Sequence, residues 1–387
     1  DQRGATQARE QGDGQGATHG DGQSEGAMHF GGATLPGATH LLPIHPFVLD
    51  PRLENEFTLE ELDDLYLKFD LLAVGETVVD FISNDKVSSL LTAERFTRYL
   101  GGQPANVAVY VAKLGARAAV LSKIGTGTFG DYVEEQLQRH GVNTESLCRT
   151  AEANTTSVFV TRTTGVPDFQ VNRGADTLLS IRDVSEELVA RARAVHTSCF
   201  ALSREPARSA IRRAIRLAAR GGKVVSLDPN YSPRVWPDKE EAWEVLAQIM
   251  PAVTIVKPSL EDARRLFDYN LSDNALEDAC LRDFHELGAK VVIVTRSGGM
   301  VTVSDGETVE RVGPLPLVQV ENVTGGRDAF WAALVVAHLD GRPWPLAVRF
   351  AHEVAALKLR VFGHVERMID REAIYQRLVE APLPQAG

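Results

Sequence analysis

The sequence predicts an α/β fold whose core is a doubly wound, mainly parallel sheet with helices on both faces. Two observations predict this class. Short apolar runs alternate with longer stretches of helical spacing through most of the chain. The apolar runs, such as 71–74 and 291–295, lack the polar alternation of a half-exposed strand. Strands of that kind are typical of a parallel sheet buried on both sides.

The first 55 residues differ in composition from the rest. They are rich in Gly, Ala, Gln and His and repeat Gly-Ala-Thr four times without a fixed spacing. Such a segment has too few apolar side chains to offset the entropy of ordering, so residues 1–55 are predicted to be a disordered tail. They resemble neither a signal peptide nor a transit peptide. Residues 56–69 predict a short helix and linker, with Thr58 as N-cap and Glu61 three residues later.

The charge distribution excludes several classes of protein. The formal net charge is −11, of which −8 falls on residues 1–68, so the remaining chain is nearly neutral. No concentrated basic patch suggests a nucleic-acid partner. No apolar run reaches the length of a membrane-spanning helix. The three cysteines are far apart and form no Cys-x-x-Cys motif, which favours a reducing, cytoplasmic location.

The folded domain is predicted at 70–380. Its first strand is the apolar run 71–74, and a helix with small residues on one side follows at 106–114. A second apolar strand and a helix are predicted at 118–124 and 131–140. Later elements are assigned by the same two patterns. They are a hairpin at 156–162 and 168–172, strands at 194–197, 223–227, 253–256 and 291–295, and helices at 208–220 and 329–339.

Polar residues follow the first strand and open the first helix. Asp80 comes just past the strand, where a carboxylate can accept hydrogen bonds from a polyol or can simply be a solvated turn residue. Gly101 and Gly102 allow a ligand close to the backbone. Asn106 offers an amide that both donates and accepts, which suits sugar hydroxyls. A plain loop-to-helix junction is the alternative.

Two later stretches point to phosphate chemistry. Asp228, Asn230 and Arg234 follow the strand at 223–227, where an arginine could neutralise a phosphate or belong to a structural loop. Gly325 and Gly326 lead into the helix at 329–339, whose N-terminal amides and dipole favour an anion. Asp328 is either a base in that first turn or a charge that the helix dipole favours. A base, an anion cradle and charge neutralisation are what phosphoryl transfer to an alcohol requires.

Together and in this order, the motifs resemble the ribokinase/fructokinase (PfkB-type) family of carbohydrate kinases. The stretch 101–108 and the stretch 324–330, which is similar to the family's T-G-A-G-D-A-F signature, carry the resemblance. The segment 228–236 resembles its D-x-N-x-R-x-x-L-W motif. The resemblance covers 70 to about 375. It implies a ribokinase-like domain with a small β-sheet lid from about 80–99 and 155–172.

The resemblance also implies the chemistry and its residues. Such kinases transfer the γ-phosphoryl of ATP to a sugar hydroxyl with Mg²⁺, and a monovalent cation is a further candidate cofactor. ATP and a small sugar are the implied partners, together with a homodimer formed through the lid. Asp328 would be the base, and Gly325, Gly326 and Arg327 the anion hole. The implied sugar-binding residues are Asp80, Gly102, Gln103, Asn106, Arg173, Asp228, Asn230 and Arg234. The implied nucleotide-binding residues are Lys257, Ser259, Thr295, Ser297, Gly298, Gly299, Thr324 and Gly325, and the implied metal ligands are Glu261 and Asp262.

The departures from the family pattern gather on the nucleotide side. Arg327 stands where the signature has glycine, Asn322 replaces an acidic residue, and Ser259 replaces the asparagine of N-x-x-E. Two hypotheses therefore remain open. One is an ATP-dependent kinase acting on a sugar like fructose or 2-keto-3-deoxygluconate. The other is a catalytically impaired relative that binds sugar or serves as a scaffold. A kinase for a nucleoside or another alcohol is a third, and a dehydrogenase is disfavoured because no G-x-G-x-x-G follows the first strand.

Overall fold

The computed structural model describes residues 67–163, 167–267, 269–314 and 324–380. The predicted tail at 1–55, the predicted helix at 57–62 and Asn322 lie outside the described residues. No described helix combines the length and the apolar character needed to cross a membrane.

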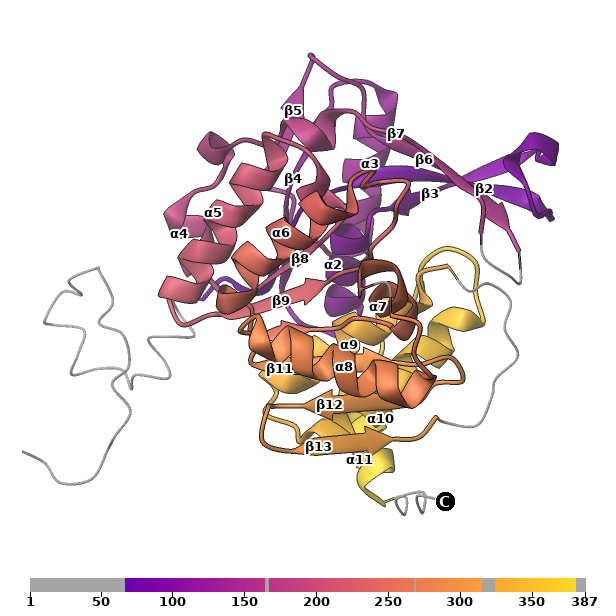
Figure 1. Cartoon of the computed structure of the whole chain (residues 1–387). Helices are drawn as coiled ribbons and strands as arrows, with labels where there is room; N and C mark the ends of the chain where they lie inside the picture. Colours follow the sequence, from indigo (N-terminus) through magenta and orange to yellow (C-terminus); the bar gives the residue numbers. More distant parts are fainter. Residues whose placement is uncertain (1–66, 164–166, 268, 315–323, 381–387) are drawn as a thin grey trace, which may run out of the picture. The chain divides into compact units, whose positions relative to one another are not determined.

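A large, mainly parallel sheet runs through the described part of the chain (Figure 1). Its strand order is β13-β12-β11-β10-β9-β8-β1-β4-β5. All neighbours pair in parallel except at the β13 edge, where β12 is antiparallel to both of its neighbours. The strands are β1 (Phe69–Val74), β4 (Ala118–Gly125), β5 (Leu147–Thr150), β8 (Ala192–Ser198), β9 (Val224–Asp228), β10 (Ile255–Val256), β11 (Val291–Thr295), β12 (Val301–Ser304) and β13 (Val309–Val312).

Helices cover both faces of this sheet, as the sequence predicts. Successive residues of β1 point to opposite faces, so Leu71 and Ala73 join one apolar core and Leu72 and Val74 the other. Residues of α2, α3, α9, α10 and α11 pack in the first core, and those of α4 to α8 in the second. The helices are α2 (Gln103–Lys113), α3 (Thr128–Arg139), α4 (Glu186–Ala190), α5 (Ala207–Arg220), α6 (Lys239–Ile249), α7 (Leu260–Phe267), α8 (Asp273–Glu286), α9 (Gly326–Leu339), α10 (Trp344–Leu359) and α11 (Arg371–Glu380).

A second, smaller sheet has the order β3-β2-β6-β7 in the described part of the chain. Its strands are β2 (Val78–Lys86), β3 (Phe96–Gly101), β6 (Ser157–Arg162) and β7 (Phe169–Asn172). The hairpin of β6 and β7 is antiparallel, as predicted, and β6 pairs in parallel with β2. In Figure 1 these strands project away from the larger sheet. The small sheet therefore combines two segments that are far apart in the sequence.

The small sheet joins the large one at two close backbone contacts. At the first, Gly102 has φ +94°, and a Cβ there would lie 2.5 Å from the carbonyl oxygen of Glu76. At the second, a Cβ on Gly174 would lie 2.1 Å from the carbonyl oxygen of Asn154, which accepts a hydrogen bond from the Ala175 amide at 2.8 Å. At each contact, the chain that leads into the small sheet, at Glu76 or Asn154, lies against the chain that leads out of it, at Gly102 or Gly174. Only glycine allows this approach.

The antiparallel edge of the large sheet is not predicted from the sequence. Strands β12 and β13 are short, and the segment before them contains Gly298 and Gly299, both at φ +86°. Such a segment is predicted to be a loop, because turn-forming residues dominate it. The turn instead folds β12 back onto β11, with Thr295 opposite Val301.

Glu76 is a buried carboxylate beside the first backbone contact. Its side chain accepts hydrogen bonds from the backbone N–H of Gln103 at 3.1 Å and from the Ser198 hydroxyl at 2.8 Å, and the residue is 2% exposed. Burial raises the pKa of Glu76 to about 8 from an ordinary 4.5. The folded chain therefore holds a proton that the unfolded chain has lost, and Glu76 lowers stability as pH rises from about 4.5 to 8.

We expect Glu76→Gln to remove this pH dependence. The free energies of unfolding of variant and wild type should match near pH 5, and at pH 8 the variant should be more stable by about 3–4 kcal/mol. Denaturant unfolding across this pH range measures both. Glu94→Gln, which changes an exposed glutamate, is the control and should follow the wild type. If the variant and the wild type differed in free energy of unfolding by the same amount at pH 5 and at pH 8, Glu76 would not be buried and protonated.

Candidate active site

Residues at the N-cap and in the first turn of α9 line two different cavities. Gly326 and Arg327 line a cavity of about 460 Å³, here called the larger cavity. The preceding Thr324 and Gly325 line a second one of about 20 Å³, here called the small cavity. The larger volume is typical of a ligand site, whereas the smaller holds about one water molecule. The start of α9 therefore borders both spaces.

Glycine shapes this helix start. Gly325 is the N-cap with φ +78°, a left-handed conformation that favours glycine. A Cβ on Gly326 would lie 2.8 Å from Cδ2 of Leu359 in α10, so the two helices approach closely there. Asp328 lies in the first turn, next to the N-terminal amides. The arrangement places a carboxylate beside an anion-binding helix end.

A hydrogen-bonded chain connects Asp328 to α2. The Asn106 amide donates from Nδ2 to Oδ2 of Asp328 at 2.7 Å, and Oδ1 of Asn106 lies 2.9 Å from Nε2 of His364. Since Oδ1 only accepts, His364 carries its proton on Nε2. Asp80 and Asn106 both line the small cavity with Gly325. The structure thus brings together predicted residues from β2, α2 and α9.

The acid–base groups around the small cavity have shifted pKa values. Burial raises the pKa of Asp328 to about 6, and the hydrogen bond from Asn106 opposes that shift. Burial and the charge of Asp328 raise the pKa of Asp80 to about 7. Burial lowers the pKa of Lys358 to about 8. Groups that titrate near neutral pH are suited to proton transfer.

The sequence did not reveal Lys358 or His364. Both line the small cavity, where Lys358 is buried at the end of α10 and donates to the carbonyl of Val361 at 3.0 Å. Neither residue belongs to one of the motifs. The only available signal was a lysine within a largely apolar helix, which is normally read as a charge at the surface.

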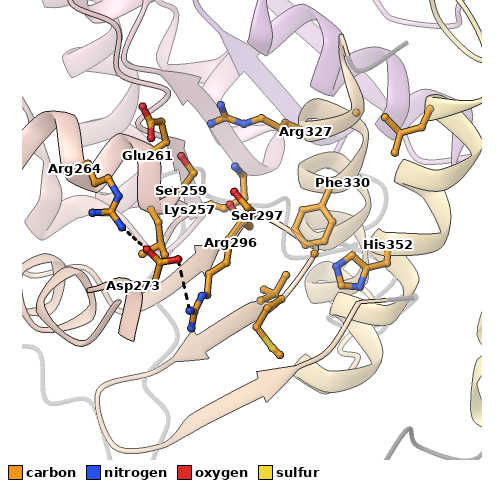
Figure 2. A pocket seen from close by; sticks show the side chains of 17 residues that line it. Lys257, Ser259, Glu261, Arg264, Asp273, Arg296, Ser297, Arg327, Phe330 and His352 are labelled. Carbon is orange, nitrogen blue, oxygen red and sulfur yellow. Dashed lines mark hydrogen bonds and ion pairs between the residues drawn. The ribbon is translucent and has the colours of Figure 1, made fainter. Parts of the chain in front are cut away.

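The larger cavity has cationic and apolar parts (Figure 2). Arg264 and Arg296 both form ion pairs with Asp273, and Phe330 and His352 lie on another side. A mixed lining of this kind suits a ligand with a planar ring and an anionic group. Among the predicted nucleotide-binding residues, those lining this cavity are Lys257, Ser259, Thr295, Ser297 and Gly299.

Arg327 points toward two buried carboxylates. Its Nη2 lies 3.1 Å from Oδ2 of Asp262 and 3.7 Å from Oδ1 of Asp228. Asp228 also pairs with Lys257 at 3.0 Å, and both of these side chains are 1% exposed. Figure 2 shows Arg327 extending toward the segment that carries Ser259 and Glu261. We name Asp228, Lys257, Asp262 and Arg327 the charge cluster.

The predicted metal ligands already have partners. Asp262 Oδ2 accepts from the Ser259 hydroxyl at 2.5 Å and amide at 3.0 Å and from Arg327, and Oδ1 accepts from the Tyr231 amide at 3.1 Å. Glu261 pairs with Arg265 at 2.9 Å. Across the described residues, no three His, Cys, Asp or Glu side chains are grouped to hold a metal ion. Mg²⁺ in nucleotide sites is bound through one or two carboxylates together with phosphates and water, and here an arginine already pairs with each of the two predicted carboxylates, so this donor set does not fit it.

Some predicted sugar-binding residues lie elsewhere. The Gln103 side chain is buried and accepts from Nε2 of His196 at 2.8 Å. Arg173 pairs with Asp176 at 2.6 Å and lines a separate cavity beside Asn154 and Gly174. Arg234 pairs with Asp168 next to β7 at 2.6 Å. Asn230 and Gly102 line neither the larger nor the small cavity, and the same holds for Gly298 of the predicted nucleotide-binding residues and for the predicted base Asp328.

Comparison with known proteins identifies the family. A model of the pfkB family carbohydrate kinases matches residues 68–370. An ATP-dependent 6-phosphofructokinase from Thermoanaerobacterium thermosaccharolyticum is 31% identical over 307 residues, 79% of this chain and 93% of that protein. The structure of Halothermothrix orenii fructokinase matches with a TM-score of 0.65 at 33% identity, over 74% of this chain and 98% of that one. A Pyrococcus horikoshii sugar kinase in complex with ATP matches with a TM-score of 0.69 at 27% identity, over 78% and 96%. The chain belongs to the pfkB family of carbohydrate kinases.

Proposed function

We propose that this protein transfers the γ-phosphoryl group of ATP to a hydroxyl of a sugar like fructose or 2-keto-3-deoxygluconate. One observation carries the proposal: the N-cap of α9 lines the small cavity, its first turn lines the larger one, and Asp328 in that turn accepts a hydrogen bond at 2.7 Å from Asn106, which lines the small cavity. The larger cavity takes the nucleotide and the small cavity the sugar. The relative solved with ATP and the fructokinase relative support these two ligands.

In this proposal Asp328 is the base. The sugar hydroxyl gives its proton to the Asp328 carboxylate while its oxygen bonds to the γ-phosphorus. The bond from that phosphorus to the bridging oxygen breaks, and ADP leaves. The amides after Gly325 face the transferred group, and Lys358 supplies a positive charge beside it. Asp80 and Asn106 hold the sugar hydroxyls.

The small cavity has to widen before a sugar can enter. Its volume of about 20 Å³ is far below that of a hexose, and Asp80 and Tyr99 in its wall belong to the small sheet. We therefore infer that the small sheet is the lid of the domain at 70–380. A homodimer through this sheet, a monovalent cation and a cytoplasmic location stay predictions of the sequence.

Release of ADP with a panel of sugars tests the function. We expect turnover with a ketose or a keto-acid sugar and a product phosphorylated on a hydroxyl, identified by mass spectrometry. ATP alone should release ADP slowly. Binding of a sugar without turnover of any panel member would contradict the kinase and favour the impaired, sugar-binding relative.

The pH–rate profile tests the role of Asp328. A base with a pKa of about 6 gives a kcat/KM that falls about tenfold per pH unit below that value. The hydrogen bond from Asn106 lowers the pKa of Asp328. Asn106→Ala should therefore raise the pH at which kcat/KM begins to fall on the acid side, independently of its effect on the maximal rate. An acid limb at the same pH in both proteins would contradict the assignment.

A further inference from the structure

Within the charge cluster two cations balance two carboxylates without a metal ion, and the carboxylate of Asp328 interacts with the cluster from the adjacent position. Its members are the buried carboxylates Asp228 and Asp262 and the cations Lys257 and Arg327, so the formal charges cancel. With glycine at position 327, two buried carboxylates would share Lys257 alone. A buried excess of negative charge is costly and attracts a cation. The arginine supplies that cation from within the chain.

Arg327 also blocks further ligation at Asp262. The carboxylate of Asp262 accepts four hydrogen bonds, three on Oδ2 and one on Oδ1. Each carboxylate oxygen offers about two lone-pair positions, so Oδ2 is fully engaged and one position remains on Oδ1. A divalent ion at Oδ2 would have to displace Arg327 or break the turn at Ser259.

The guanidinium keeps donors free for a ligand. Only Nη2 of Arg327 contacts the two carboxylates, and the side chain is 50% exposed. An arginine has five N–H donors in a planar fork that matches phosphate oxygens. Arg327 also lines the larger cavity, as does Lys257, the other cation of the charge cluster. One residue therefore neutralises the carboxylates and faces the place proposed for the nucleotide.

We propose that the Arg327 guanidinium takes the place of a divalent cation at Asp228 and Asp262, so that the larger cavity binds a nucleoside triphosphate without Mg²⁺. This inference rests on the proposed function only in assigning the larger cavity to the nucleotide. It gives Arg327 two roles: binding the nucleotide and balancing the negative charges of Asp228 and Asp262.

Calorimetric titration with AMP-PNP, a triphosphate analogue that is not turned over, tests the proposal. The full chain is titrated in excess EDTA and in excess MgCl₂. Wild type should show a Kd that differs by about twofold or less between the two conditions, whereas Arg327→Gly should bind about tenfold more weakly in EDTA than in MgCl₂. Arg264→Ala is the matched control. It removes a cation that lines the same cavity but contacts neither aspartate, so its Kd should change by the same factor in both conditions.

The outcomes separate this inference from the kinase proposal. Wild type that binds only with MgCl₂ overturns the inference and leaves the kinase standing. Binding in neither condition overturns both. Equal metal dependence of wild type and Arg327→Gly overturns the role of Arg327. The wild-type comparison needs no variant, so it decides the main point even if Arg327→Gly fails to fold.

Discussion

Replacing Asp328 with asparagine should lower kcat for phosphoryl transfer by a factor of about 100 to 10,000. The substitution keeps the size of the side chain and an oxygen that accepts from Nδ2 of Asn106, which lies 2.7 Å away in the wild type. It removes the carboxylate that takes the proton of the sugar hydroxyl. The KM for the sugar should change less than kcat, because Asp80 and Asn106 still line the small cavity, although loss of the Asp328 charge lowers the pKa of Asp80.

Initial-rate kinetics with the preferred sugar measure this loss. Asp340→Asn is the matched control, since Asp340 is the C-cap at the other end of α9 and contacts Tyr375 and Arg371 rather than either cavity. Its kcat should change by about twofold or less. Asp328→Asn with nearly full activity would exclude Asp328 as the base. Unfolding curves of both variants show whether the helix remains intact.

Replacing Lys257 with methionine should cost about 3–5 kcal/mol of stability. Lys257 and Asp228 form a 3.0 Å ion pair, and Nζ lies 5.5 Å from the ring centroid of Trp331. Methionine has a similar volume, so the loss comes from the charge left on Asp228. Arg327, 3.7 Å from Asp228, compensates that charge only in part.

A double-mutant cycle isolates this effect. Adding Asp228→Asn to Lys257→Met removes the unpaired charge and should recover more than half of the lost free energy of unfolding. The control is Arg377→Met, which breaks an exposed pair with Glu353 of similar length, 2.8 Å, and should cost less than about 1 kcal/mol. If Lys257→Met cost no more than this control, the charge cluster would not contribute to stability.

The motifs of the candidate site could be predicted because they lie in short segments. Gly325, Gly326 and Asp328 are neighbours in the sequence, and local helix chemistry gives them their arrangement. The direction of Arg327 could not be predicted. Its partner Asp262 is 65 positions away on another helix, and only the folded sheet brings the two side chains together.

Other residues, inside and outside the motifs, also show that long-range packing limits prediction from the sequence. Gln103 stands in a motif, but the start of α2 turns its side chain toward His196 and away from the cavities. Lys358 and His364 stand in no motif, and the end of α10 and the segment that follows it bring them to the small cavity. The buried parallel strands were predictable because burial on both faces leaves a continuous apolar run.

The two close backbone contacts of the small sheet have a mechanical consequence. Gly102 lies against Glu76 at one and Gly174 against Asn154 at the other, and every chain crossing between the two sheets passes through one of these points. A body held at two points keeps one rotation, about the line that joins them. Opening of the inferred lid would therefore turn the small sheet about the line through these two contacts, and pairs across the boundary such as Arg234–Asp168 would have to break.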